Sequence, residues 1–299
     1  MPPPISQRRD RIDLTGASLL VGFSLLMGLN QALIKIVNSG FAPVFQAGLR
    51  SACAILPVLL FAVWARKKLA LRDGSLWPGL LCGVLFSIEF LLLFQAIDFT
   101  SVARASVFFY TMPFWVALGA HVLIPGEGLT PIRLVGLGLA IAGVVLALSD
   151  KATPVGPSAW LGDLMCLMAA SLWAALALIM RLSRLNRASP EMQLLYQLGV
   201  SAVLLVAVAP LFGDTVREVT PAIIAIFSFQ VLVVVSVGFL GWFWVLSVYP
   251  APQMASFSFL APVFGVFFGW LILGETITPN IIGALSLVAI GIFLVNRRR

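Results

Sequence analysis

Glu89 is the acidic residue best placed for chemistry, because it lies in the middle of a long apolar run, residues 77–97. A charge at the centre of a bilayer costs about 2.5 kcal/mol or more, so such a group faces a wet cavity, pairs with a cation or takes up a proton. Two interpretations stay open. Glu89 binds a substrate ammonium or carries a proton, or it is a structural polar group bonded to a neighbouring helix.

Aromatic rings surround this position in the sequence. Phe86 and Phe90 lie one helical turn apart, and Glu89 follows Phe86 by three residues, so the three share a helix face. Rings beside a carboxylate suit an amino acid with an apolar side chain, through stacking and ammonium–π contact. Other inner aromatic residues are candidates for the same cavity or for ordinary packing: Tyr110, Trp115, Trp173, Phe239, Trp242 and Phe257.

Two further polar groups interrupt the first apolar runs. Asn30 and Gln31 form a polar step within residues 14–37, and unpaired amides in lipid are costly, so we expect them to face the bundle. Hydrogen bonding between helices and contact with substrate both remain open for them. Lys35 and Arg50 lie near the external ends of the first two spans, where they either snorkel outward or line the exit and attract a substrate carboxylate.

Two prolines are candidates for hinges. Pro113 and Pro262 lie inside spans, where a proline frees a backbone carbonyl and usually kinks the helix. A kink at equivalent places could serve as a hinge or as a fixed bend for packing. Asp98 and Arg104 flank a short loop nearby and could form a weak surface ion pair.

The residues give no support to a metal centre, a cofactor or an enzyme. Cys53, Cys82 and Cys166 are far apart within apolar runs and lack CxxC spacing, so we interpret them as small buried hydrophobes. The sequence contains no catalytic triad, Walker loop, zinc-ligand spacing or GxGxxG motif. We therefore expect no metal and no cofactor, and we expect that the protein is not an enzyme.

The composition predicts an all-α membrane protein. The chain is 61% hydrophobic and 10% charged, whereas a soluble domain is nearer half apolar and a quarter charged. Its apolar runs are continuous rather than alternating, which favours helices over a barrel. Ten spans of about the length that crosses a bilayer are predicted at 14–37, 44–65, 77–97, 102–122, 131–149, 160–181, 190–210, 221–246, 251–273 and 280–296.

The chain also repeats itself. The segment Gly126-Glu127-Gly128-Leu129-Thr130-Pro131 reappears as Gly274-Glu275-Thr276-Ile277-Thr278-Pro279, about half the chain later. This divides the protein into two five-helix repeats, residues 1–150 and 151–299. Because five is odd, the second repeat enters the membrane from the opposite side, which gives inverted topology and suits a transporter with a shared midplane site.

Loop charges predict the orientation. The formal net charge is +7, and the basic residues form short clusters between apolar runs, so the partner is the lipid bilayer and not nucleic acid. The positive-inside rule then places both termini in the cytoplasm. The clusters on this side are Arg8, Arg9 and Arg11, then Arg66, Lys67, Lys68 and Arg72, then Arg133, then Arg181, Arg184 and Arg187, and finally Arg297, Arg298 and Arg299.

Taken together, these features resemble the drug/metabolite transporter superfamily, EamA type. The resemblance rests on the ten spans, the two halves, the Pro…Gly-Glu…Thr-Pro pattern in each, and the positions of Lys35 and Arg50. It implies efflux of small metabolites through a central cavity by alternating access, in a bacterial inner membrane. Within the superfamily the chain is most similar to bacterial aromatic amino acid exporters, which implies an amino acid as substrate.

Three alternatives stay open at this point. The same fold could carry purines, drugs or other metabolites. An intramembrane enzyme would need a catalytic pair that the sequence does not display. A channel would need a repeated filter-like loop or a charged ring, and neither is present. The oligomeric state and any coupling to protons are left open.

Overall fold

The computed structural model describes residues 13–67, 69, 71, 73–150, 156–239, 241, 245, 257 and 259–296. Over these ranges the chain is almost entirely helical, and the strand-like pairing in them is an isolated bridge between Phe41 and Val216. Nine helical segments there are long and apolar enough to cross a membrane. The predicted all-α membrane architecture is confirmed.

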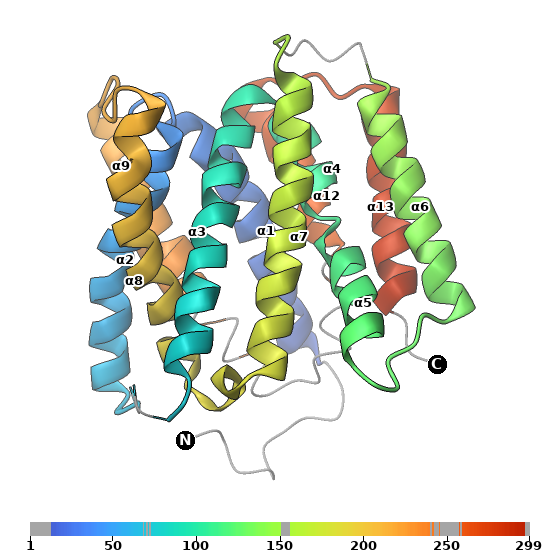
Figure 1. Cartoon of the computed structure of the whole chain (residues 1–299). Coiled ribbons are helices and arrows are strands. Elements are labelled where there is room, and N and C mark those ends of the chain that lie inside the picture. The colour runs from blue at the N-terminus through green and yellow to red at the C-terminus, as the bar shows by residue number, and fades with distance from the viewer. Residues whose placement is uncertain are drawn as a thin grey trace.

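In the first half, the described residues form six helices that build five spans (Figure 1). They are α1 (Leu14–Val37), α2 (Pro43–Trp64), α3 (Leu76–Phe99), α4 (Val102–Phe109), α5 (Met112–Leu123) and α6 (Pro131–Leu148). The second half contains α7 (Ala159–Leu182), α8 (Pro190–Val208), α9 (Pro221–Phe229), the π-helix η4 (Gln230–Gly238), α12 (Leu260–Leu273) and α13 (Pro279–Asn296), with short 3₁₀ helices η2 (Arg184–Arg187) and η3 (Ala209–Phe212).

Most predicted spans coincide with observed helices to within a few residues, and one is interrupted. The span predicted at 102–122 is divided into α4 and α5 by a turn at Tyr110 and Thr111. Of the span predicted at 251–273, residues 251–256 and 258 lie outside the described residues, and α12 forms its second part.

The two prolines begin helices rather than bend them. Pro113 is the second residue of α5 and Pro262 the third of α12. Proline is tolerated in a first turn because its missing N–H would have no partner there. The prediction of a kinked continuous helix at Pro113 is therefore wrong in detail, because the helix ends before the proline and starts again. A hinge at this break remains a prediction.

Helices α6 and α13 show that the two repeats are inverted. A Cβ atom placed on Gly136 would lie 2.9 Å from the carbonyl oxygen of Gly291, and one on Gly143 would lie 2.9 Å from that of Ala284. Residue numbers rise along one helix as they fall along the other, so the helices are antiparallel. Both begin with the equivalent Thr-Pro of the repeated motif. Equivalent helices that run in opposite directions are the mark of inverted topology.

The outer surface is apolar, as lipid requires. Large hydrophobic side chains stand exposed on several helices, among them Trp64, Val122, Ile141 and Val203. The largest fully buried side chains are Phe94 of α3 and Phe108 of α4. Figure 1 shows that α1 begins and α13 ends at the same end of the bundle. This agrees with an even number of crossings, while the cytoplasmic location of that end stays a prediction.

The close approach of α6 and α13 can be tested by enlarging one glycine. We expect Gly291→Leu to lower the free energy of unfolding by about 1–3 kcal/mol, because its side chain would overlap the Gly136 carbonyl and the Phe114 ring. The measurement is thermal unfolding of the purified protein in detergent. Gly138→Leu is the matched control, since nothing lies within 4 Å of a Cβ at that position. Equal stability of the two variants would contradict the tight packing.

Candidate functional site

A cluster of polar side chains, all buried except the half-buried Asn30, lies between four helices in the interior of the bundle. Its members come from α1, α2, α3 and η4, and each replaces an apolar residue in an otherwise hydrophobic span. They are Asn30, Gln46, Arg50, Glu89 and Gln230. We call this set the polar cluster.

Arg50 points into the bundle instead of outward. The residue is 3% exposed, and its guanidinium carbon lies 4.8 Å from the centre of the Phe90 ring and 4.6 Å from that of Phe94. Its Nη1 donates to Asn30 Oδ1 at 3.5 Å. The expectation that Arg50 snorkels to the external surface is therefore wrong, because two aromatic faces on α3 and an amide on α1 hold the cation inside.

Glu89 lies in the same region without a direct partner for its charge. The residue is 1% exposed, and its Oε2 makes no hydrogen bond with any residue that the structure describes. Arg50 lies nearby, since its guanidinium stacks on Phe90, the residue that follows Glu89, yet no ion pair within 4 Å joins the two charges. The two side chains therefore share one buried region, and each keeps a polar atom without a hydrogen-bond partner.

Amides connect the rest of the cluster. Asn30 Oδ1 accepts from Gln230 Nε2 at 3.3 Å, and Gln230 Oε1 accepts from Gln46 Nε2 at 3.3 Å. Three buried atoms here have no hydrogen-bond partner: Gln46 Oε1, Arg50 Nε and Glu89 Oε2. Each such orphan costs about 1–3 kcal/mol. One donor and two acceptors are therefore available to a ligand or to water.

Sequence reasoning missed Gln46 and Gln230. The pattern that identified Asn30 and Gln31, an amide within an apolar span, also holds for Gln46 and Gln230. Gln230 also begins the π-helix, in which Ser236 Oγ donates to the Val231 carbonyl at 2.9 Å. Such π-helical stretches are rare and occur often at functional sites.

The aromatic residues next to Glu89 are buried beside the cluster. Phe86 is 5% and Phe90 9% exposed, and their ring centres are 3.9 Å apart. Phe94 continues the row, with its ring centre 5.5 Å from that of Phe90. Phe86, Glu89 and Phe90 thus lie together on α3, as predicted, and the structure adds Arg50, which the sequence had placed at an external end; the role of these residues in binding stays a prediction.

Gln31 and Tyr110 lie elsewhere in the bundle. Gln31 Oε1 accepts a hydrogen bond from Ser106 of α4 at 2.5 Å, so this amide oxygen bonds between helices. Tyr110 is buried at the break between α4 and α5, edge-on to Phe109.

Those of the remaining predicted aromatic residues that the structure describes make their contacts in other parts of the bundle. Trp115 is 40% exposed and lines an apolar groove of about 380 Å³ between α5 and α7. Trp173 packs against the main core and Phe239 against a second core between α2, α8 and α9. The Phe257 carbonyl accepts a 3.5 Å hydrogen bond from Ser24, and Trp242 lies outside the described residues.

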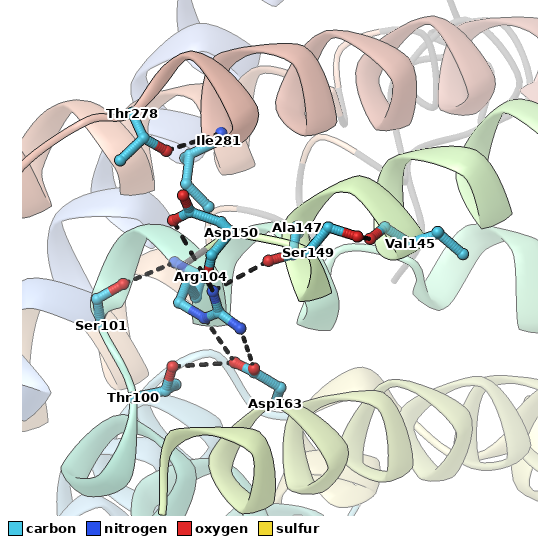
Figure 2. A network of polar contacts seen from close by, with 10 residues as sticks. All are labelled: Thr100, Ser101, Arg104, Val145, Ala147, Ser149, Asp150, Asp163, Thr278 and Ile281. Carbon is cyan, nitrogen blue, oxygen red and sulfur yellow. Dashed lines mark hydrogen bonds and ion pairs between the residues drawn. The ribbon is translucent and has the colours of Figure 1, made fainter. Parts of the chain in front are cut away.

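A second polar network lies at the end of the bundle where α3 ends and α4 begins (Figure 2). Arg104, 4% exposed, bonds to Asp163 of α7 through two nitrogens, at 3.2 and 2.5 Å. It also donates to the carbonyls of Ala147 and Asp150 at 3.0 and 3.2 Å. Thr100 donates to Asp163 at 2.9 Å. Each of these hydrogen bonds satisfies a buried polar group, so the network holds α4, α6 and α7 together and has a structural role.

The expected pair between Asp98 and Arg104 is wrong. Arg104 turns inward to Asp163, while Asp98 lies 3.3 Å from Arg217 in an exposed pair. Lys35 lies at the same end of the bundle, where its Nζ donates to the Thr100 carbonyl at 2.5 Å and lies 3.8 Å from Glu275. No group of His, Cys, Asp and Glu among the described residues is arranged to hold a metal ion.

Comparison with known proteins decides the family. The model of the EamA-like transporter family matches residues 14–149 and again residues 160–297. The chain belongs to this family. The two matches correspond to the two halves of the sequence repeat, so an EamA repeat occurs twice in one polypeptide.

Two relatives of this EamA transporter are similar to it along nearly their whole length. An uncharacterized transporter, YoaV of Bacillus subtilis (strain 168), is 27% identical over 92% of this chain and 94% of its own. A probable amino-acid metabolite efflux pump of Salmonella typhimurium is 28% identical over 90% and 91%. A solved crystal structure shares the fold with a TM-score of 0.68 at 20% identity, covering 93% of this chain and 96% of that one. The protein is thus a multi-pass membrane transporter and not an enzyme.

The Arg104 network gives a stability prediction for this EamA transporter. We expect Arg104→Met to lower the free energy of unfolding by about 3–5 kcal/mol, because it leaves Asp163 buried without its cation. Thermal unfolding in detergent measures the loss. Asp98→Asn removes the charge of an exposed pair at the same end of the bundle, while Arg217 keeps its hydrogen bond to the Asn38 carbonyl, and should cost about 1 kcal/mol at most. If both variants lost a similarly small free energy of unfolding, the buried network would contribute no more to stability than the exposed pair.

Proposed function

We propose that this transporter exports small amphipathic metabolites, above all neutral and aromatic amino acids, by alternating access around the polar cluster. The observation that carries the proposal is the joint burial of Arg50 and Glu89, each with an unpartnered polar atom, inside the membrane. A site with one fixed cation and one fixed anion is matched by a zwitterion. Such a ligand adds no net charge. Its carboxylate and its ammonium would each be paired with a buried charge of opposite sign.

The carboxylate of the ligand would bind Arg50. The rings of Phe90 and Phe94 hold the guanidinium in place, and Asn30 takes one of its hydrogen bonds. The free Nε is a donor of the kind that carboxylates prefer, because a guanidinium presents several N–H groups in a fixed plane. A preorganised cation of this kind loses little side-chain entropy on binding.

The ammonium of the ligand would bind Glu89, and its side chain would lie against the rings. Glu89 Oε2 is free to accept a hydrogen bond, and Phe86 and Phe90 stand on the same helix face. An ammonium beside aromatic faces gains cation–π attraction, and an aromatic side chain gains ring contact. Gln46 Oε1 offers a further acceptor close to the same cluster.

Export and an inner-membrane location belong to the same proposal. The name of the Salmonella relative, a probable amino-acid metabolite efflux pump, supports both the direction and the substrate class. Inverted repeats supply the mechanism, since two related halves can rock about a site between them. Helices α1, α2 and α3 of the first half and η4 of the second all contribute to the polar cluster, so movement of one half against the other would change access to it.

The proposal is tested by flux into proteoliposomes, with no ATP and no imposed pH gradient. We expect saturable uptake of labelled phenylalanine and tryptophan, competed by other neutral amino acids. We expect Glu89→Gln to slow this flux by about 10- to 100-fold, the factor for losing a hydrogen bond to a charged group.

Glu191→Gln is the matched control for this substitution. Glu191 is another buried carboxylate with an unpartnered oxygen, but it pairs with Lys67 far from the polar cluster. Its variant should keep the wild-type rate. Transport of a nucleobase or an amine drug but of no amino acid, with or without a pH gradient, would contradict the proposed substrate. Equal rates for wild type and Glu89→Gln would contradict the proposed site.

A further inference from the structure

The glutamate of the repeated Gly-Glu motif in the second half reaches across to the first half. Glu275 Oε1 accepts from the backbone N–H of Val102 at 2.7 Å, and Oε2 accepts from that of Ala103 at 2.9 Å. These N–H groups open helix α4 and have no partner within the helix. A carboxylate at a helix N-terminus is also favoured by the helix dipole. Glu275 therefore caps a helix that belongs to the other repeat.

Neighbouring residues extend this cap into a connected closure. Lys35 of α1 lies 3.8 Å from Glu275 and donates to the Thr100 carbonyl, which ends α3. Gly269 of α12 leaves room for the carboxylate, because a Cβ there would lie 2.7 Å from Glu275 Oε2. A pocket of about 420 Å³ lies directly against these groups, and Lys35, Ser101 and Glu275 are part of its wall.

The equivalent glutamate in the first half also contacts the other half, but through an ion pair and not as a helix cap. Glu127 lies at the opposite end of the bundle, in the loop before α6, where it forms an ion pair with Arg181. Hydrogen bonds from Arg181 lower the pKa of Glu127 below its ordinary value, so this carboxylate is ionised at neutral pH. Its side chain is 35% exposed, against 11% for Glu275. Two residues with the same place in the repeat thus have different surroundings at the two ends.

We infer that the contact of Glu275 with the start of α4, supported by Lys35, is a latch that closes one end of the transporter and must break when that end opens. In an inverted-repeat transporter the two ends open in turn, so a contact between repeats at one end has to be conditional. The loop charges predict that this end is external. The latch then blocks release of substrate to the outside until Glu275 leaves α4.

The latch is tested by the accessibility of a cysteine one turn beneath it. Ser106 of α4 is fully buried and bonds to Gln31, so Ser106→Cys reports water entry past the latch. Cys53, Cys82 and Cys166 are replaced by alanine, and a membrane-impermeant maleimide is applied to whole cells and to inside-out vesicles. We expect Glu275→Gln to raise the labelling rate about tenfold from one side only, as loss of one charge-assisted hydrogen bond would do.

Glu127→Gln makes the same chemical change at the other end of the bundle. It should leave the labelling rate unchanged on the side where Glu275→Gln raises it. Gly269→Ala provides a second variant if Glu275→Gln does not accumulate, because its Cβ displaces the Glu275 carboxylate while the glutamate itself is kept. An unchanged labelling rate in folded Glu275→Gln or Gly269→Ala would overturn the latch. A lowered melting temperature would not rescue it, because a cap that never opens would change stability without changing access to Ser106→Cys. The experiment uses no substrate, so its result is independent of which metabolite is carried.

Discussion

Every polar group in this bundle is governed by the absence of water from the bilayer core. The helices satisfy their own backbone, but a side-chain charge or amide in a span must find a partner or a cavity. The chain meets this constraint in two ways. Around Arg104 the partners are complete, with Asp163 and two backbone carbonyls all in contact. Around Arg50 and Glu89 they are incomplete. The first arrangement fits a fixed structural role, and the second fits a place that a ligand completes.

The same constraint explains why the repeats are joined by a few buried contacts rather than by a broad polar interface. Small residues bring α6 and α13 together, with Gly136 against Gly291 and Gly143 against Ala284. Charged contacts between the halves lie near the ends of the bundle, as with Lys35 and Glu275. Helices held together mainly by apolar packing can slide past one another. The contact between a carboxylate and a helix terminus, in contrast, is either formed or broken. A transporter that alternates between two states needs both kinds of contact.

Much of the architecture could be predicted from the sequence, because continuous apolar runs and the repeated Gly-Glu…Thr-Pro motif determine spans and their inversion. Glu89 and Arg50 were identifiable since lone charges in apolar runs need a physical reason. Partner choice was not predictable: Arg104 pairs with Asp163, 59 residues away, and not with nearby Asp98. Nor could the sequence distinguish rings that face lipid, such as Trp115, from buried ones such as Phe90, because both faces of these helices are apolar.

The central claim is that Arg50 and Glu89 together recognise a zwitterion. The most direct measurement is calorimetric binding to the purified protein of phenylalanine, of phenethylamine, which lacks the carboxylate, and of hydrocinnamate, which lacks the ammonium. The account predicts that phenylalanine binds and that either analogue binds at least about tenfold more weakly, since each leaves one buried charge without its partner. Glu89→Gln should remove the preference for phenylalanine over hydrocinnamate. Equal affinity for all three ligands, or an unchanged preference in Glu89→Gln, would contradict it.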